Sequence, residues 1–287
     1  MKLLLTGAGG LLGSAVSALA QQHGDQCHAM ARPALDTPVA ALAAQLRGAD
    51  LLLHAAANTN VEQCEREPDA CYRDNFLLSE LLARAAAQAQ VPLLLVSSTG
   101  LYGTADSAPY REYAATVPTT HHHRSKLLAE QAVLAAAPGN LVLRTGWLFG
   151  GAASLPKNFV ARRIDEARKA LAQGDSMAAN TEQHGVPCWN VDIAGRMLAL
   201  ARSGASGVYN CVNSGTATRY EYVQAVLQLA GIALPLQPGQ AAGFQRIAQV
   251  SPNEMADNWK MRMQGWPEMP HWRASLERYL QSELADY

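Results

Sequence analysis

Three consecutive histidines stand just before a lysine in the stretch VPTTHHHRSKLLAEQ, which covers residues 117–131. A free imidazole has a pKa of about 6.5 and can therefore move a proton at neutral pH. Residues four positions apart share one face of a helix, so His122 and Lys126 are predicted to lie together, whereas His121 points away. Neighbouring helical side chains diverge by about 100°, which disfavours a metal site built on the triplet. The spacing therefore favours proton transfer, and we predict no metal.

A glycine-rich turn, TGAGGLLG, occupies residues 6–13 and has the spacing GxxGxxG. In dinucleotide-binding proteins the first glycine allows a tight turn, the second lets the backbone approach a pyrophosphate, and the third lets the helix pack on the strand. The amino end of the following helix then faces the phosphate charge. We therefore expect Gly7, Gly10, Leu11 and Leu12 to bind a nicotinamide dinucleotide.

The residue that ends the second expected strand distinguishes NAD from NADP. An acidic side chain there binds the ribose 2′-hydroxyl, and an arginine accommodates a 2′-phosphate. The strand ends at Arg32 and offers no acid, so NADP is favoured and NAD stays open. The turn that follows the third strand is placed to approach the adenine and the ribose. Three of its residues are expected to contact the cofactor: Ala55, Ala56 and Ala57.

Short apolar strands and helices must alternate to position these residues. Apolar runs predict strands at residues 2–5, 26–32, 50–57, 92–99 and 140–146, and helical patterns lie at 11–21, 69–89 and 120–136. Strands that alternate with helices of about 10 to 20 residues indicate βαβ units and a parallel sheet covered on both faces. We therefore predict a doubly wound α/β fold.

The alternation weakens after Gly150, where a basic helical pattern and proline-rich connections follow. Residues 1–150 are predicted to form the dinucleotide-binding Rossmann domain. The run GVYNCVN looks like a strand that returns to it, so pieces at about 186–213 are included. Residues 151–185 and 214–287 are predicted to form a smaller substrate-binding lobe over the carboxyl edge of the sheet.

Length and charge limit the kinds of partner. The chain has 287 residues, of which 49% are hydrophobic, and a formal net charge of −1. This composition allows a large core, but binding of phosphates by bulk charge needs a basic excess that the chain lacks. We therefore expect a small-molecule ligand, no nucleic acid and no membrane, and leave a homodimer open.

The cysteines and the apolar runs indicate a cellular compartment. Five cysteines occur without a CxxC pair, so neither a disulfide framework nor a zinc site is suggested. No stretch approaches the roughly 18 unbroken apolar residues of a membrane span. Glycines interrupt the apolar N-terminal run that could otherwise imitate a signal peptide. We therefore expect reduced thiols and a cytoplasmic protein.

Several longer blocks occur in one order along the chain. They include TGAGGLLG, HAAANTNVEQCEREPDACYRDN, LLLVSSTGLYG, HHHRSKLLAEQ, LVLRTGWLFG, EQHGVPCWNVDIA and GVYNCVNSGTATRYEY. With these blocks the chain resembles the extended short-chain dehydrogenases, most closely the dTDP-4-dehydrorhamnose reductase family of sugar-nucleotide-binding, RmlD-like proteins. The resemblance covers nearly the whole chain. It implies a Rossmann fold with a smaller lobe, and transfer of hydride from NAD(P)H to a keto group of a deoxysugar nucleotide.

The resemblance also implies catalytic positions. The family uses a Ser or Thr at the end of the fourth strand and a Tyr-x-x-x-Lys pair on the next helix. Ser98 takes the hydroxyl position, which orients the carbonyl, and Lys126 takes the lysine position, which holds the nicotinamide ribose. The tyrosine, which would give a proton to the alkoxide, is replaced by His122.

This replacement leaves four interpretations of the triplet open. His122 could serve as the general acid, although Lys126 would lower its pKa and imidazole is shorter than phenol. The protein could be a catalytically silent, cofactor-binding family member that acts as a regulatory subunit. It could also be an ordinary reductase in which the tyrosine has been replaced, or the triplet could bind a metal.

Further substrate contacts follow from the same resemblance. The residues expected to contact the sugar nucleotide are Thr59, Glu62, Thr99, Trp147 and Asn158. Lys157, Arg162 and Arg163 offer the local positive charge that a diphosphate requires, although the two arginines could equally be a solvated helix face.

Overall fold

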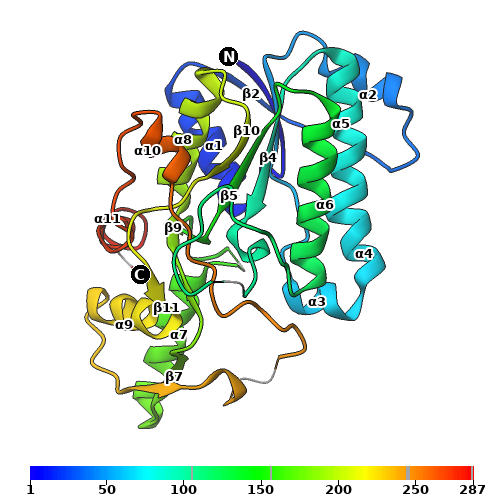
Figure 1. Ribbon diagram of the computed structural model, residues 1–287. Coiled ribbons are helices and arrows are strands. Elements are labelled where there is room, and N and C mark those ends of the chain that lie inside the picture. Colours follow the sequence, from blue (N-terminus) through cyan, green and yellow to red (C-terminus); the bar gives the residue numbers. More distant parts are fainter. Residues whose placement is uncertain (105, 156, 244–245, 286) are drawn as a thin grey trace.

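The computed structural model describes residues 1–104, 106–155, 157–243, 246–285 and 287. Its centre is a six-stranded sheet in the order β10-β5-β4-β3-β1-β2, with every neighbouring pair parallel (Figure 1). The strands are β1 (Lys2–Thr6), β2 (Gln26–Ala29), β3 (Leu51–His54), β4 (Leu93–Ser98), β5 (Leu141–Thr145) and β10 (Gly207–Asn210). The predicted parallel sheet and the predicted return strand are confirmed.

The inner strands are apolar on both faces because helices cover both. All residues of β3 and β5 are buried, as is usual for strands inside a parallel sheet. Helices α1 (Leu11–Gln22) and α8 (Asn190–Arg202) cover one face (Figure 1). The other face carries α2 (Val39–Leu46), α5 (Leu78–Ala89) and α6 (His121–Ala136). The second strand is shorter than predicted, so Arg32 lies in the loop beyond it.

The predicted helix at residues 69–89 is interrupted. Helix α3 (Val61–Arg66) is followed by α4 (Pro68–Tyr72), then by one π-helical turn, η1 (Arg73–Leu77), and then by α5. Single π-turns inside helices are frequent at functional sites. This turn carries the buried Asn75 and packs against α6. The interruption therefore brings an amide to the helix that carries the histidines.

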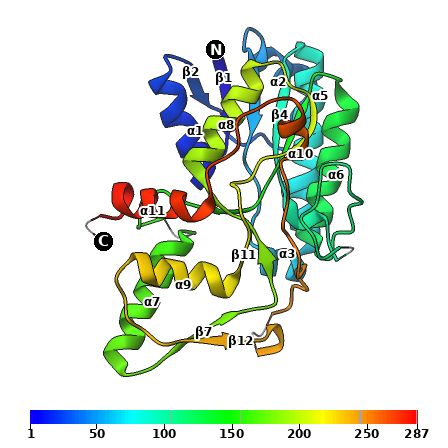
Figure 2. The same cartoon turned by 60° about the vertical axis from the view of Figure 1, so that its left-hand side comes forward.

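The remaining elements form a lobe beside the carboxyl edge of the sheet (Figure 2). Its helices are α7 (Phe159–Gln173), α9 (Arg219–Leu229) and α11 (Trp272–Glu283). Three small sheets pair β6 (Trp147–Phe149) with β9 (Pro187–Trp189), β7 (Met177–Asn180) with β12 (Leu236–Gly239), and β8 (His184–Gly185) with β11 (Ala217–Thr218). Short 3-10 turns lie at η2 (Thr99–Leu101) and η3 (Ala241–Gly243). Aromatic rings, among them Phe149 and Tyr222, fill the core of the lobe.

The boundary between the two parts differs from the predicted division at one segment. Helix α10 (Trp259–Met263) packs beside β10, and Met261 and Met269 are buried in the core of the large sheet. The chain then returns to the lobe as α11. Residues near 259–269, predicted as part of the lobe, therefore pack with the sheet.

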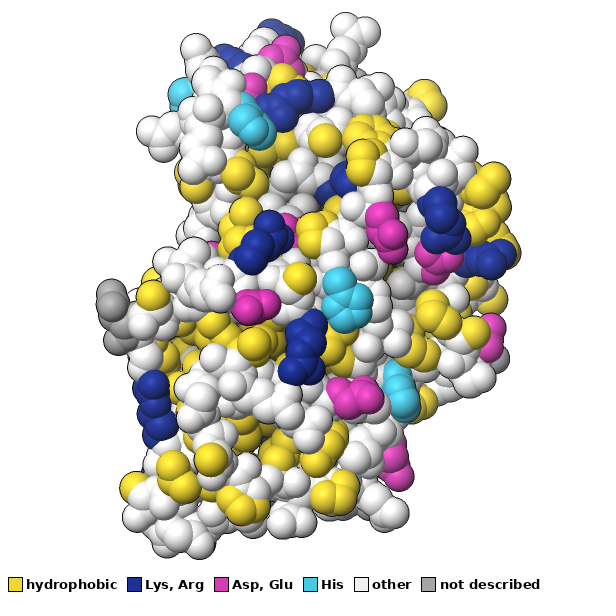
Figure 3. Space-filling view, turned by 90° about the vertical axis from the view of Figure 1, so that its left-hand side faces the viewer, with side chains coloured by type: hydrophobic (Ala, Val, Ile, Leu, Met, Phe, Trp, Pro, Cys, Tyr) yellow, Lys and Arg dark blue, Asp and Glu magenta, His cyan; other side chains and the backbone are white. Residues whose placement is uncertain are grey.

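The distribution of charged side chains can be followed on one face of the molecule. Acidic and basic side chains are interspersed on the face drawn in Figure 3. Within the described ranges, no helix has both the length and the apolar character that crossing a membrane requires.

Candidate active site

A cleft of about 1770 Å³ lies between the carboxyl edge of the large sheet and the lobe. In the sheet, β2 and β3 lie on opposite sides of β1, so the strand order reverses there. The cleft lies at this switch point, which is where ligands bind in open α/β sheets. Twelve of the predicted site residues line it: Gly7, Gly10, Leu11, Leu12, Arg32, Ala55, Ala56, Ala57, Thr59, Glu62, Ser98 and Trp147. His122 and Lys126 also line it, so the fold brings nearly the whole predicted set together.

The glycine loop has no room for larger residues. Gly7 has φ of 74°, and a Cβ there would lie 2.7 Å from the backbone nitrogen of Ala56. A Cβ on Gly13 would lie 2.1 Å from the carbonyl oxygen of Gly7. Helix α1 begins after Gly10 with no side-chain cap and no acidic residue in its first turn. Its positive amino end is therefore uncompensated and suits a pyrophosphate.

Buried polar groups behind the loop hold the strand ends in place. Nδ1 of His54 lies 2.6 Å from the hydroxyl of Thr6, and its Nε2 lies 3.0 Å from the hydroxyl of Ser79. Burial, with a smaller contribution from the charge of Lys126, lowers the pKa of His54 to about 3, so this imidazole is neutral. It joins β1, β3 and α5 as a structural element of the site.

Arg32 has a partner at the cofactor end of the cleft. Its guanidinium forms an ion pair with Asp74, and 53% of its side chain is exposed. Asp74 also lines the cleft. An anionic group bound here would therefore compete with this carboxylate for Arg32.

Hydroxyl groups at the ends of β4 and β5 are available for a ligand. Among the described residues, the buried hydroxyls of Ser97 and Thr145 have no hydrogen-bond partner, and both residues line the cleft. The hydroxyl oxygen of Ser98 accepts from the backbone nitrogen of Gly100 at 3.2 Å, which leaves its proton free to donate. Buried polar groups are normally paired, so unpaired ones beside a cleft fit a polar ligand such as a cofactor amide or a carbonyl. The sequence analysis did not select Ser97.

His122 lies in the first turn of α6 and is almost fully buried. Its Nδ1 lies 3.0 Å from the carbonyl oxygen of Asn58 and 3.4 Å from Nδ2 of Asn75. A carbonyl oxygen can only accept, so the shorter contact assigns the proton to Nδ1 and leaves Nε2 as the acceptor. Burial and the charges of His123 and Lys126 hold the pKa of His122 well below its usual range. The ring is therefore neutral at physiological pH.

Its neighbour His123 contacts the threonine that caps α6. The backbone nitrogen of His123 donates to the hydroxyl of Thr120, which caps α6, and its Nδ1 lies 3.0 Å from the same oxygen. The ring lies against Gly100, where a Cβ would be 2.2 Å from Nε2. The third member, His121, lies with Nδ1 3.3 Å from the hydroxyl of Tyr72. His121 therefore points away from the other two, as the helical spacing predicts, whereas the rings of His122 and His123 lie edge to face with their centroids 5.0 Å apart.

Lys126 is buried one turn further along α6. Burial lowers its pKa to about 8, although the carboxylate of Glu130 acts in the opposite direction. That carboxylate is held by Arg144 on β5, with Nη2 2.7 Å and Nε 3.0 Å from its two oxygens. The result is an ammonium group on the cleft wall that can lose its proton close to neutral pH.

The lobe contributes a cation and an aromatic ring to the opposite wall. The guanidinium carbon of Arg219 lies 3.5 Å from the centre of the Trp147 ring, and the indole nitrogen donates to Glu254 at 2.6 Å. Burial, opposed by Glu254, lowers the pKa of Arg219 to about 10. The sequence analysis missed Arg219 and Glu254. The one local signal for either residue is that Arg219 directly follows Thr218, which caps α9, so that the arginine lies at the start of a helix.

More positive groups line the lobe side of the cleft: Lys157, Arg162, Arg163 and Arg246. Nζ of Lys157 donates to the hydroxyl of Thr59 at 2.7 Å. The carboxylate of Glu62 accepts from the backbone nitrogen of Ile247 at 3.0 Å and so joins the sheet side to the lobe. The expected substrate residues Thr59 and Glu62 thus lie where the two parts meet.

Two expected substrate residues lie outside the cleft lining. Thr99 is fully buried in η2. Asn158 is also fully buried and caps α7, with Oδ1 accepting from the backbone nitrogen of Ala161 at 3.0 Å. Its Nδ2 donates to the hydroxyl of Tyr279 at 2.6 Å. The contacts of Asn158 are those of a helix cap, so the expectation of substrate contact is corrected for it. The buried hydroxyl of Thr99 has no hydrogen-bond partner among the described residues, and its contact with substrate stays a prediction.

Comparison with known proteins gives a matching family model, relatives and solved structures. A family model described as RmlD substrate binding domain matches residues 1–285. The dTDP-4-dehydrorhamnose reductase of Mycobacterium tuberculosis is 34% identical over 283 residues, which cover 96% of this chain and 91% of that protein. The structure of a dTDP-4-dehydrorhamnose reductase from Clostridium acetobutylicum has a TM-score of 0.91 at 24% identity and covers 100% of both chains.

A second solved structure, that of the dTDP-4-dehydrorhamnose reductase from Bacillus anthracis in complex with NADP, has a TM-score of 0.90 at 23% identity. It covers 98% of this chain and 99% of that one. These two structures agree with the fold described above. The family match over residues 1–285 and the relative at 34% identity go further. The chain belongs to the RmlD substrate binding domain family.

Proposed function

We propose that the protein is an NADPH-dependent reductase that acts on the keto group of a nucleotide-activated deoxysugar of the dTDP-4-dehydrorhamnose type. One observation carries the proposal: a single cleft joins the glycine loop, the group Ser98, His122 and Lys126, and a basic wall on the lobe. These three parts suit a dinucleotide, a carbonyl and a diphosphate. The name of the Mycobacterium tuberculosis relative supports the same reaction.

The cofactor end favours NADPH, with NADH as the alternative. The crowded glycines around Gly7 and the open amino end of α1 suit the pyrophosphate. Arg32 suits a 2′-phosphate if it exchanges its contact with Asp74 for that group. NADP in the Bacillus anthracis relative supports this choice. When bound, NADPH supplies the hydride that is added to the carbonyl carbon.

The lobe end supplies contacts for the substrate. Trp147 with Arg219 offers a flat, positively charged wall for the sugar, and Lys157, Arg162 and Arg163 offer charge for the diphosphate. Domain boundaries at about residues 150, 186 and 213 remain part of the proposal, with residues 259–269 assigned to the sheet side.

The proton must come from a group that carries one. Hydride addition leaves an alkoxide, and the neutral tautomer of His122 has no proton on Nε2. Lys126, whose pKa is about 8, is largely protonated at pH 7. We therefore assign the proton to the ammonium of Lys126. The ammonium transfers it to Nε2 of His122, and the imidazolium then gives it to the alkoxide. Ser98 donates a hydrogen bond to the carbonyl oxygen and orients it. The amine then regains its proton from solvent.

The same tautomer favours one second candidate, a family member that binds cofactor and nucleotide sugar without turnover. Steady-state oxidation of NADPH with dTDP-4-dehydrorhamnose separates the two, with His122→Tyr and His122→Ala as comparisons. We expect measurable turnover, lower in His122→Ala. If no version turns over while NADPH still binds, the reductase proposal fails and the binding role is supported. If His122→Ala equals the unchanged protein, the histidine has no part in proton transfer.

The setting of the protein is also proposed. Free cysteines suit a cytoplasmic location, where NADPH and reduced thiols are maintained. A homodimer is the proposed assembly, and light scattering after size-exclusion chromatography tests it.

A further inference from the structure

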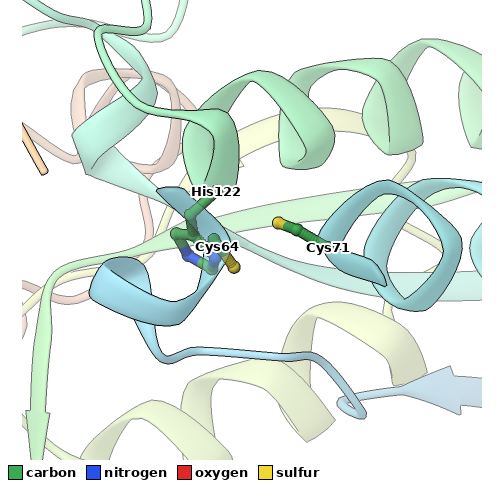
Figure 4. A group of neighbouring side chains, drawn as sticks. All are labelled: Cys64, Cys71 and His122. Atoms are coloured by element: carbon green, nitrogen blue, oxygen red, sulfur yellow. The ribbon is translucent and has the colours of Figure 1, made fainter. Parts of the chain in front are cut away.

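Two cysteines, Cys64 and Cys71, lie beside His122 in space, although several helices and strands separate them from it along the chain. Cys64 comes from α3, Cys71 from α4 and His122 from α6, and their side chains point toward one another (Figure 4). Both sulfur atoms and a ring nitrogen of His122 lie within 4.8 Å of one another. Both cysteines are fully buried. The sequence analysis predicted no metal, because it could not place these thiols next to the histidine.

The spacing of these atoms is close to that of a metal site. Zinc holds sulfur at about 2.3 Å and nitrogen at about 2.0 Å, so ligand atoms of a tetrahedral site lie about 3.5 to 3.8 Å apart. Since the three atoms lie within 4.8 Å of one another, each pair needs to approach by at most about 1.0 to 1.3 Å. Rotation of the short cysteine side chains can supply this approach. The two cysteines lie on different helices, α3 and α4, which Glu67 separates.

The surroundings also suit a cation held by thiolates. Nδ2 of Asn75 lies 3.5 Å from the sulfur of Cys71 and can donate to a thiolate there. The carbonyl oxygen of Asn58 lies 3.0 Å from Nδ1 of His122 and 3.8 Å from the sulfur of Cys64, so an oxygen ligand is near. Two thiolates neutralise a divalent cation, and no net charge is then added beside the buried ammonium of Lys126. His122 lines the cleft, which gives an ion a route to the site.

We propose that Cys64, Cys71 and His122 form a binding site for a thiophilic divalent cation of the Zn²⁺ class, and that occupation of this site inhibits the enzyme. A neutral imidazole has one free lone pair, so an ion that occupies it leaves His122 unable to take up a proton. The ion also displaces the contacts of Asn75. The inhibitory part rests on the proposed function, whereas the binding part does not. Soft sulfur ligands with one imidazole favour Zn²⁺ over Mg²⁺ or Ca²⁺.

Binding is tested without turnover. The full-length protein, kept reduced with a phosphine, is titrated with Co²⁺, and the sulfur-to-cobalt charge-transfer absorption is recorded; Zn²⁺ is then added in competition with a chromophoric chelator. We expect one equivalent to bind, with affinity lower by on the order of 100-fold in Cys64→Ser and in Cys71→Ser. Cys27→Ser is the matched control, because Cys27 lies on β2, away from this cluster.

Some binding results overturn the site. Absence of a charge-transfer band in the unchanged protein does so, as does a band that persists in Cys64→Ser/Cys71→Ser or disappears in Cys27→Ser. Circular dichroism and thermal unfolding of each variant show whether it is folded. Loss of the band in a folded variant supports the proposal.

Inhibition is tested separately, by NADPH oxidation in the presence of Zn²⁺. The unchanged protein and Cys27→Ser should lose at least tenfold in rate at one equivalent, and Cys64→Ser/Cys71→Ser should keep its rate. If one equivalent binds and the rate of the unchanged protein does not fall, the inhibitory role is wrong. If the protein has no reductase activity at all, the titration with Co²⁺ still decides the metal site.

Discussion

Nδ1 of His122 donates to the carbonyl oxygen of Asn58 at 3.0 Å, and this contact sets the chemistry of the site. It directs the single N–H proton of the neutral imidazole to a backbone carbonyl. The nitrogen left over, Nε2, can take up a proton but has none to give. Reduction of a carbonyl needs a donor, so the histidine depends on Lys126, which is four residues further along α6.

Replacement of His122 by tyrosine should raise the rate of reduction. A phenol carries its own proton, and the positive charge of Lys126 would lower its pKa, so we expect kcat to increase by about 10-fold or more at pH 7. Steady-state NADPH oxidation measures the change. His121→Tyr is the control, since His121 contacts Tyr72 and is absent from the cleft lining, and its rate should stay unchanged. An equal rise in both variants would contradict the role of position 122.

The rate should depend on the protonation of Lys126. Its pKa is about 8, so the reacting ammonium is present below that pH and is lost as the pH rises through it. We expect kcat to be level near pH 6 to 7 and to fall about tenfold per pH unit well above pH 8. Lys126→Met should lose on the order of 100-fold in kcat and show no such fall. A profile that is governed instead by a group near pH 6.5 would point to the imidazole as the donor.

The same lysine should lower the stability of the folded protein. Its pKa falls from an ordinary 10.5 to about 8, so the folded state binds this proton less tightly than the unfolded chain does. The sign is that folding becomes more favourable as the pH rises from 8 to 10.5. Lys126→Met should therefore increase the free energy of unfolding by roughly 1 to 3 kcal/mol at pH 7. Urea denaturation measures this, and a gain that does not shrink above pH 10 would rule out the charge as its cause.

The ion pair between Arg32 and Asp74 should control the choice of cofactor. Arg32→Ala removes the group that suits a 2′-phosphate, so the KM for NADPH should rise about 10-fold while that for NADH changes little. Asp74→Asn releases Arg32 and should lower the KM for NADPH. Parallel assays with the two cofactors give both values. The assignment of Arg32 is wrong if Arg32→Ala affects NADH and NADPH equally.

The contact of Arg219 with the Trp147 ring should affect the substrate and not the cofactor. Arg219→Ala removes a cation from the lobe wall, and the KM for the sugar nucleotide should rise about 10-fold with the KM for NADPH unchanged. The matched control is Arg273→Ala, because Arg273 lies on α11 and bonds Gln228 outside the cleft. A parallel loss of NADPH binding in Arg219→Ala would show that the change disturbs the whole cleft.

Much of the fold could be predicted from the sequence, because local patterns carry it. Uniform apolar runs mark strands buried on both faces, and the glycine spacing marks the first turn. The capping threonine before the histidines marks the start of α6 at His121. The order of the longer sequence blocks was sufficient to identify the family, and the comparisons confirm that family.

Other features depend on tertiary contacts that no local pattern contains. The cluster of Cys64, Cys71 and His122 forms where three helices, α3, α4 and α6, meet. Asn158 was assigned to the substrate from the family resemblance, and in the structure its side chain caps α7. Arg219 becomes a wall of the cleft only when the lobe folds over Trp147.

The return of the chain to the large sheet at Met261 and Met269 has a consequence for truncation. A fragment that stopped at residue 250 would hold all six strands and yet leave the side of Tyr209 and Val212 without its cover. Exposed apolar surface of this kind promotes aggregation. The residues after 250 are therefore needed to close a core that residues 1–212 begin, and the whole chain should melt in one transition.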